Sequence, residues 1–131
     1  MKTTACPCGT GRPLAACCGP ALAGSAPPAT AEALMRSRYT AFALGDASYL
    51  LATWHAGTRP ATLDLDETPR PQWIGLQIKA HRPVLDGDAD RAEVEFVARY
   101  RLGGRAHRLH ETSRFVREHG RWFYVDGDLH D

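Results

Sequence analysis

The sequence lacks several features that would assign it to a broad class. It contains no apolar run near the length of a membrane-spanning helix. Neither charge is in excess, because 16 Lys and Arg stand against 15 Asp and Glu, and this balance does not indicate nucleic-acid binding. No Ser-His-Asp order, phosphate-binding loop or His-Glu-x-x-His motif is present. The motifs therefore favour a protein that is not an enzyme, without deciding the question.

Cysteine is absent from all but the first eighteen residues, where Cys6, Cys8, Cys17 and Cys18 lie. We expect no secretion signal, because residues 1–5 contain no apolar stretch, and we therefore expect a cytoplasmic protein with reduced thiols. Clustered cysteines in such a chain favour a metal site. Two disulfides or four unconnected thiols are the alternatives, although a disulfide between two adjacent cysteines would be strained.

The cysteine spacing suits one small ion. A Cys-x-Cys pair and a Cys-Cys pair are separated by eight residues, so a hairpin can supply two sulfurs from each arm. Tetrahedral Zn²⁺ takes four thiolates at about 2.3 Å. Four protein ligands leave no position for water or substrate, and the predicted zinc is therefore structural rather than catalytic.

The cysteine segment also resembles a known motif. Residues 6–19 read Cys-Pro-Cys-Gly-Thr-Gly-Arg-Pro-Leu-Ala-Ala-Cys-Cys-Gly. They are similar to the SEC-C motif, the zinc knuckle at the end of the SecA translocation motor. Thr10 departs from the usual serine of that motif, and Leu14 departs from the usual aromatic residue. The resemblance implies a zinc knuckle with all four cysteines as ligands.

Four further segments resemble the YchJ-like family of bacterial proteins. They are Glu-Ala-Leu-Met-Arg-Ser-Arg-Tyr-Thr-Ala-Phe at 32–42, Tyr-Leu-Leu-Ala-Thr-Trp-His at 49–55, His-Glu-Thr-Ser-Arg-Phe at 110–115 and Trp-Phe-Tyr-Val-Asp-Gly at 122–127. That family joins a SEC-C knuckle to a nuclear transport factor 2-like domain, and its biochemical function is not established. The resemblance implies a cystatin-like cone, in which a curved antiparallel sheet wraps around N-terminal helices.

The helical half of the chain is predicted from caps and proline. Thr30 is a plausible N-cap for a helix that reaches about residue 44, and a shorter helix is expected over 47–54. Pro27 and Pro28 favour an extended connection. We therefore divide the chain into a zinc knuckle at 1–19, a surface linker at 20–31 and a nuclear transport factor 2-like domain at 32–131.

The second half of the chain alternates with the period of β-strands. A loop over 56–71 precedes a first strand at 73–80, and a turn is expected at 86–90. Three further strands follow at 94–102, 106–118 and 122–126, with a glycine pair at 103–104 as a hairpin signal. Helices followed by a meander of four strands predict an α+β fold.

The third predicted strand places a carboxylate on an apolar face. Period two puts Leu109, Glu111, Ser113 and Phe115 on the same side. A buried carboxylate needs a partner, for which Arg38 is the first candidate. Glu111 could be a general base or ligand contact in a cone pocket, or half of a structural clamp with Arg38. The candidate pocket residues are Arg38, Tyr39, Trp54, His55, Glu111, Trp122, Tyr124 and Asp126.

The histidines give weaker signals. His107 and His110 lie three apart on a strand, so they point to opposite faces and cannot share one metal. His81, His119 and His130 are expected to be solvated.

Two functions are carried forward from the sequence. The first is a non-enzymatic adaptor that docks on a protein partner through the exposed loop around Arg12, on a mobile knuckle. The resemblance suggests a partner in the secretion or ribosome-associated machinery, which is an analogy from the motif alone. The second is a small-molecule-binding or enzymatic domain that uses the cone pocket. A homodimer through the open sheet face, with Glu95, Val97, Arg99 and Arg101, is a further expectation.

Overall fold

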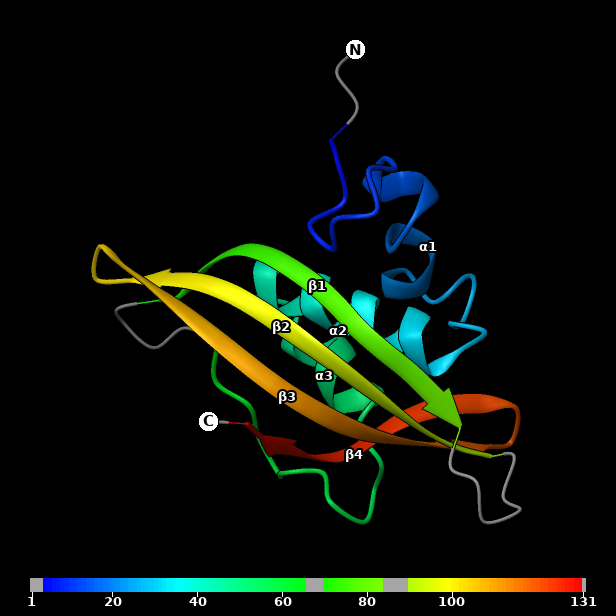
Figure 1. Ribbon diagram of the computed structural model, residues 1–131. Helices are drawn as coiled ribbons and strands as arrows, with labels where there is room; N and C mark the ends of the chain where they lie inside the picture. The colour runs from blue at the N-terminus through cyan, green and yellow to red at the C-terminus, as the bar shows by residue number, and fades with distance from the viewer. Residues whose placement is uncertain (1–3, 66–69, 84–89, 131) are drawn as a thin grey trace.

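The computed structural model describes residues 4–65, 70–83 and 90–130. Two short elements, η1 (Leu14–Ala16) and α1 (Gly19–Leu22), precede α2 (Ala31–Leu44) and α3 (Ala47–Ala52). The strands are β1 (Gln72–Pro83), β2 (Arg91–Leu102), β3 (Arg105–Glu118) and β4 (Arg121–Leu129). They form one antiparallel sheet in the order β1-β2-β3-β4, and the helices lie on one side of it (Figure 1). The predicted α+β fold is confirmed.

Part of the predicted loop at 56–71 and most of the predicted turn at 86–90 lie outside the described residues. No described helix is long and apolar enough to cross a membrane.

Helix α2 begins and ends where its sequence predicts. The side chain of Thr30 accepts a hydrogen bond from the Ala33 backbone N–H at 3.0 Å, which caps the first turn. Gly45 ends the helix with a left-handed φ of 77°, a conformation that glycine adopts without strain. Most of α2 is buried, because the sheet, α1 and α3 all pack against it.

Helix α3 ties the chain to the last strand. Asp46 caps it by accepting from the Tyr49 backbone N–H at 3.0 Å. After α3, the Tyr124 backbone N–H donates to Thr53 O at 2.8 Å and the His55 N–H donates to Tyr124 O at 2.7 Å. These two bonds hold Trp54 against β4, where its ring lies edge-on to Tyr124 with centroids 5.2 Å apart.

Among the described residues, two tight hairpin turns connect β2 to β3 and β3 to β4. Gly103 and Gly104 both have positive φ, at 58° and 82°, as a two-residue turn of the primed type requires. His119 and Gly120 form the second turn, with φ of 54° and 78°. A register shift between Arg114 and Phe115 adds a bulge against β4, so the strand bends around the helices.

Two expectations about the N-terminal part are wrong. The cysteines were expected on a mobile appendage, but Cys6, Cys8 and Cys18 are buried within the same core cluster as Leu34 and Phe115. The first residues of the expected extended linker form α1, because proline is tolerated in the first turn of a helix. The half-buried side chain of Leu22 packs against the core from α1.

Candidate metal centre and cone cavity

Residues 4–19, called here the cysteine hairpin, fold back on themselves before α1. The Cys6 N–H donates to Arg12 O at 2.9 Å, and the Leu14 N–H donates to Thr4 O at 2.8 Å. Gly9 and Gly11 make the reversal with φ of 86° and 84°. The fold of the hairpin brings all four cysteine sulfurs within 4.8 Å of one another.

The sulfur cluster fits a tetrahedral ion. Two sulfurs that each lie about 2.3 Å from a tetrahedral zinc are about 3.8 Å apart. The Sγ atoms of Cys8 and Cys17 are 3.6 Å apart, and all four cysteines are free thiols rather than disulfides. The arrangement is therefore compatible with metal binding by four thiolates.

The cluster favours negative charge on one sulfur, that of Cys8, because its hydrogen bond with Cys18 lowers the pKa of Cys8 and raises that of Cys18. A hydrogen bond with Cys18, larger in effect than the opposing burial, lowers the pKa of Cys8 to about 4. Burial raises the pKa of Cys17, whose Sγ lies 3.1 Å from the Thr10 hydroxyl. One thiolate among hydrogen-bonding thiols is the arrangement that a cation at the centre would complete.

The cysteine hairpin is docked on α2. The Sγ of Cys6 lies 3.6 Å from the hydroxyl of buried Thr40, and Arg36 Nη1 donates to Cys8 O at 2.9 Å. On the other side, the backbone of Gly9 approaches β1, since a Cβ at this position would lie 3.6 Å from Leu76 O. The cysteine cluster is thus part of the domain core and shares its packing.

A second feature is a cavity of about 290 Å³ between α2 and the concave face of the sheet, called here the cone cavity. Its walls are mainly aromatic and aliphatic. They are formed by Met35, Arg38, Tyr39, Phe42, Trp54, Trp73, Phe96, Ala98, Leu109, Glu111, Ser113 and Tyr124. The predicted inward phase of the third strand is the one observed, since Leu109, Glu111 and Ser113 share this face.

Arg38 is the buried cation of the cavity wall. It is 3% exposed, and its Nη1 donates to Leu50 O at 2.8 Å and to the Thr53 hydroxyl at 2.7 Å. Its guanidinium lies 4.6 Å from the ring centroid of Tyr124. Burial lowers the pKa of Arg38 to about 10, so it stays charged at neutral pH.

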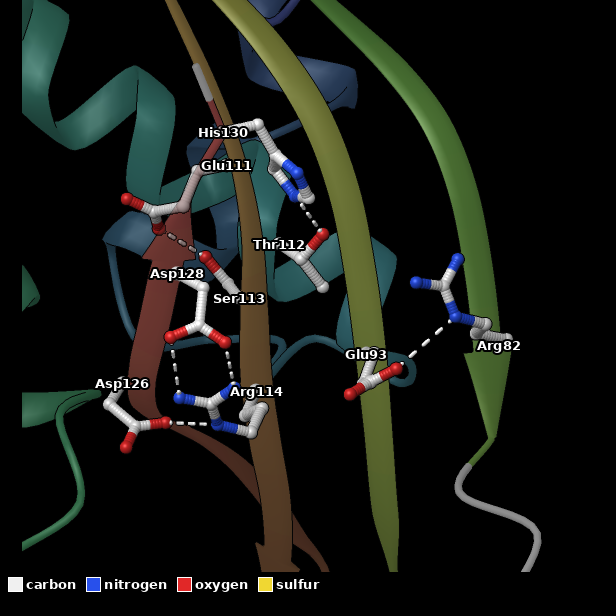
Figure 2. Close-up of polar contacts among 9 residues, drawn as sticks. All are labelled: Arg82, Glu93, Glu111, Thr112, Ser113, Arg114, Asp126, Asp128 and His130. Carbon is white, nitrogen blue, oxygen red and sulfur yellow. Dashed lines mark hydrogen bonds and ion pairs between the residues drawn. The ribbon is translucent and has the colours of Figure 1, made fainter.

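The clamp between Arg38 and Glu111 that the sequence suggested is not present among the described residues. Arg38 instead donates to the Leu50 carbonyl near the end of α3, which also accepts from the Thr53 hydroxyl at 3.4 Å. The side chain of Glu111 accepts a hydrogen bond from the Ser113 hydroxyl at 2.6 Å (Figure 2). Burial, and then the nearby charge of Glu111, raise the pKa of Tyr124 to about 12, so this phenol is neutral.

Gly127 makes room for the Glu111 carboxylate. It lies on β4 opposite Ser113. A Cβ at position 127 would lie 2.6 Å from Glu111 Oε2, closer than such atoms approach, and 3.1 Å from Thr112 O, which is a tight contact. The missing side chain on β4 is therefore what lets a carboxylate sit on the concave face of β3.

The cone cavity brings together five of the eight predicted pocket residues, namely Arg38, Tyr39, Trp54, Glu111 and Tyr124. The other three lie elsewhere. Trp122 donates through Nε1 to Ala29 O at 3.2 Å, and His55 lies 3.1 Å from Glu118 Oε1 through Nε2. Asp126 accepts from Arg114 Nε at 2.6 Å on the convex face (Figure 2).

Some residues that line the cone cavity were not predicted from the sequence. Trp73 packs edge-on to Tyr39 with ring centroids 5.7 Å apart, and Phe42 lies 6.0 Å from Trp73. An aromatic residue at the start of the first predicted strand, facing a helix with aromatic residues three apart, was the available signal. Strand spacing alone does not state which helix face the strand meets.

The convex face of the sheet is mostly charged. Arg114 pairs with Asp126 and Asp128, and Arg82 pairs with Glu93 (Figure 2). Val97 lies on this face but is only 1% exposed, because the longer side chains on the neighbouring strands cover it. On the expected dimer surface the charged side chains are thus the accessible ones, and Val97 is covered.

Comparisons with known proteins agree with this architecture. The family described as YchJ, middle NTF2-like domain, matches residues 30–127, and the SEC-C motif matches residues 3–20. A UPF0225 protein of Polaromonas naphthalenivorans is 58% identical, with 96% of this chain and 98% of the relative covered. A UPF0225 protein of Chromobacterium violaceum is 59% identical, with 94% and 91% covered. The names of these relatives state no activity.

Solved structures show the same arrangement. The solution structure of a SEC-C motif containing protein from Rhodopseudomonas palustris has a TM-score of 0.83 at 34% identity, covering 98% of this chain and 100% of that one. The crystal structure of a SEC-C motif containing protein from Psychrobacter arcticus has a TM-score of 0.77 at 27% identity, covering 98% and 84%. The chain therefore belongs to the YchJ-like UPF0225 family, in which a SEC-C motif precedes a nuclear transport factor 2-like domain.

Proposed function

We propose that the protein is a cytoplasmic, zinc-stabilised binding domain whose cone cavity takes a small, largely apolar molecule. The four cysteines hold one structural Zn²⁺, which four thiolates would complete as a closed tetrahedral site. That ion supplies folding energy and leaves no open position for a substrate. The ligand-binding part of the proposal therefore rests on the cone cavity and not on the metal centre.

The observation that carries the proposal is a carboxylate set in an aromatic cavity. Ligand sites are typically apolar hollows of a few hundred Å³ with a small number of placed polar groups, and this cavity of about 290 Å³ is close to that range. The Ser113 hydroxyl donates a hydrogen bond to Oε2 of Glu111. The carboxylate can accept further hydrogen bonds from a ligand. The favoured ligand is an aromatic or aliphatic molecule with one hydrogen-bond donor, such as an amine.

A matched pair of probes tests this function. Benzylamine and benzyl alcohol share a ring and differ in the charge of the donor, so Glu111 should favour benzylamine. We expect both to bind in the millimolar range, as suits such small molecules. The change Glu111→Gln should weaken the binding of benzylamine about tenfold, which is the loss expected for one hydrogen bond to a charged group. It should change the affinity for benzyl alcohol less.

The three tryptophans supply the readout. Trp54 and Trp73 line the cavity, whereas Trp122 lies outside it. Titrations followed by NMR of the indole N–H groups should therefore shift the first two signals and leave the third in place. Equal shifts of all three signals, or no shift at saturating probe, would contradict binding in the cone cavity.

A second candidate function is docking on a protein partner, and the exposed tip of the cysteine hairpin favours it. The sulfurs of Cys6, Cys8 and Cys18 are buried, whereas Gly11 and Arg12 face solvent. The Arg12 guanidinium stays near the cluster, with Nη2 3.8 Å from Cys17 Sγ. By analogy with the motif, the proposed partner belongs to the secretion or ribosome-associated machinery, for which the secretion motor and the ribosome serve as probes.

We expect Arg12→Glu to weaken this docking about tenfold or more, because an arginine at the centre of an interface contributes strongly to binding. The measurement is co-sedimentation with purified ribosomes and titration against the purified secretion motor. Arg105→Glu is the matched control, since Arg105 is exposed in the hairpin between β2 and β3. Retained affinity in Arg12→Glu, or equal losses in both variants, would count against docking through this tip.

A further inference from the structure

The convex face of the sheet carries a second group of metal-ligating side chains. Glu95 on β2, His110 on β3 and His130, which directly follows β4, each offer one ligand atom, and these atoms lie within 4.8 Å of one another. We propose that these three residues form a second metal site, open to solvent, that takes Zn²⁺ or a divalent transition ion of similar softness. This site is separate from the cysteine cluster and from the cone cavity.

The strand register explains why the three side chains meet. The His130 backbone N–H donates to His110 O at 2.8 Å, so the two residues are opposite one another across β4 and β3. Val97 is the partner of His110 on β2, and Glu95 is two residues away, on the same face. Direct and diagonal neighbours on one sheet face are within reach of long side chains. The sheet itself therefore fixes the cluster.

The side chains are already in contact. His110 Nε2 and Glu95 Oε2 are 2.7 Å apart, and the rings of His110 and His130 stack with centroids 4.3 Å apart at 25°. His130 is exposed, as the sequence predicts, but its ring also contacts two neighbouring side chains. A metal would replace the proton that His110 and Glu95 share, and a rotation of the imidazole rings would turn their nitrogen lone pairs toward it.

Two imidazoles and one carboxylate suit a borderline transition ion. This ligand set holds Zn²⁺ in hydrolytic enzymes and iron in oxygenases, and in both it leaves coordination positions for water. Hard ions such as Mg²⁺ prefer oxygen ligands and should not bind here. The proposed site thus differs in kind from the cysteine cluster, which four thiolates close.

Two neighbouring side chains affect the cluster: Thr112 orients one imidazole ring, and Arg82 places a positive charge close by. The Thr112 hydroxyl lies 2.7 Å from His130 Nε2, and Thr112 is 8% exposed, so it holds one nitrogen of the ring from a fixed position. Arg82 Nη1 lies 3.8 Å from Glu95 Oε1 and opposes a cation. Arg82 also pairs with Glu93 at 3.2 Å, which offsets part of its charge.

The test is a calorimetric titration of Zn²⁺ into protein that already holds its structural zinc. The native chain should bind a second equivalent, whereas His110→Gln and His130→Gln should lose it. His107→Gln is the matched control, since His107 lies on the same strand but on the opposite face, stacked on Tyr100. The control should keep the second equivalent, and Mg²⁺ should give no binding in any variant.

His130 is exposed and lies outside β4, so its replacement should leave the fold intact, as circular dichroism and the retained first zinc would show. NMR of the imidazole nitrogens gives a second readout in the native chain. The signals of His110 and His130 should shift with added Zn²⁺, and that of His107 should not. The proposal is overturned if no second equivalent binds, if both variants keep it, or if His107→Gln loses it equally.

Discussion

Removing the metal from the cysteine cluster should lower the melting temperature of the whole protein by more than about 10 °C. Cys6, Cys8 and Cys18 are buried in the same core cluster as Leu34 and Phe115. Without the ion, their sulfurs would therefore stay buried inside the domain with no cation between them. Structural zinc contributes about 10–16 kcal/mol to the folding of small zinc-finger peptides, whereas a whole domain is stable by only about 5–15 kcal/mol. A decrease of about 3 kcal/mol in the free energy of unfolding is enough to lower the melting temperature by about 10 °C.

The experiment compares thermal unfolding of the zinc-loaded protein with and without a strong chelator, followed by addition of Zn²⁺. The melting temperature should fall with the chelator and recover with the ion. Cys8→Ser should start low and no longer respond to the chelator. Thr10→Ala keeps all four ligands and should respond like the native chain. A single cooperative transition at an unchanged temperature after complete zinc removal would refute a structural role.

The second large effect is expected at Gly127. The change Gly127→Ala should destabilise the protein by about 1–3 kcal/mol, the usual cost of overpacking. The added Cβ would meet Glu111 Oε2 at 2.6 Å and Thr112 O at 3.1 Å. A carboxylate can rotate away but a backbone carbonyl cannot, so the side chain of Glu111 should be displaced and part of the strain should remain. The measurement is urea unfolding at constant pH.

Gly75→Ala is the matched control for Gly127→Ala. Gly75 also lies in a strand, but an added Cβ there would have open space around it. Alanine should be neutral or slightly stabilising at position 75, because glycine costs conformational entropy in a strand. Benzylamine affinity should fall in Gly127→Ala and stay unchanged in Gly75→Ala. Equal stability of the two variants would mean that the carboxylate does not occupy the space beside β4.

The features that the sequence predicts well are local ones. The cap at Thr30 and the glycine pair at 103–104 each act within a few residues, and the structure places them as expected. The inward phase of β3 was also predictable, since alternation assigns every residue of a strand to one of two faces. The four cysteines needed no more than their spacing for a metal cluster to be predicted.

The features that the sequence did not predict depend on contacts between distant segments. Arg38 bonds to Leu50 and Thr53 rather than to Glu111, because α3 ends beside it and offers acceptors that sequence order does not reveal. His130 reaches His110 only through the β3–β4 register, which a bulge shifts. The burial of the cysteine hairpin depends on packing with α2, and a strong local motif gives no information about such packing.

One helix serves both the metal centre and the cavity. Arg36 and Thr40 of α2 contact the cysteine hairpin, and Arg38 and Tyr39 line the cone cavity. A local opening that frees α2 would therefore disrupt both sites together. If the proposed Zn²⁺ and cavity ligand each stabilise the closed form of α2, each would strengthen the binding of the other by an equal free energy. Where free zinc is scarce, an abundant cavity ligand would then raise the fraction of the protein that holds its metal.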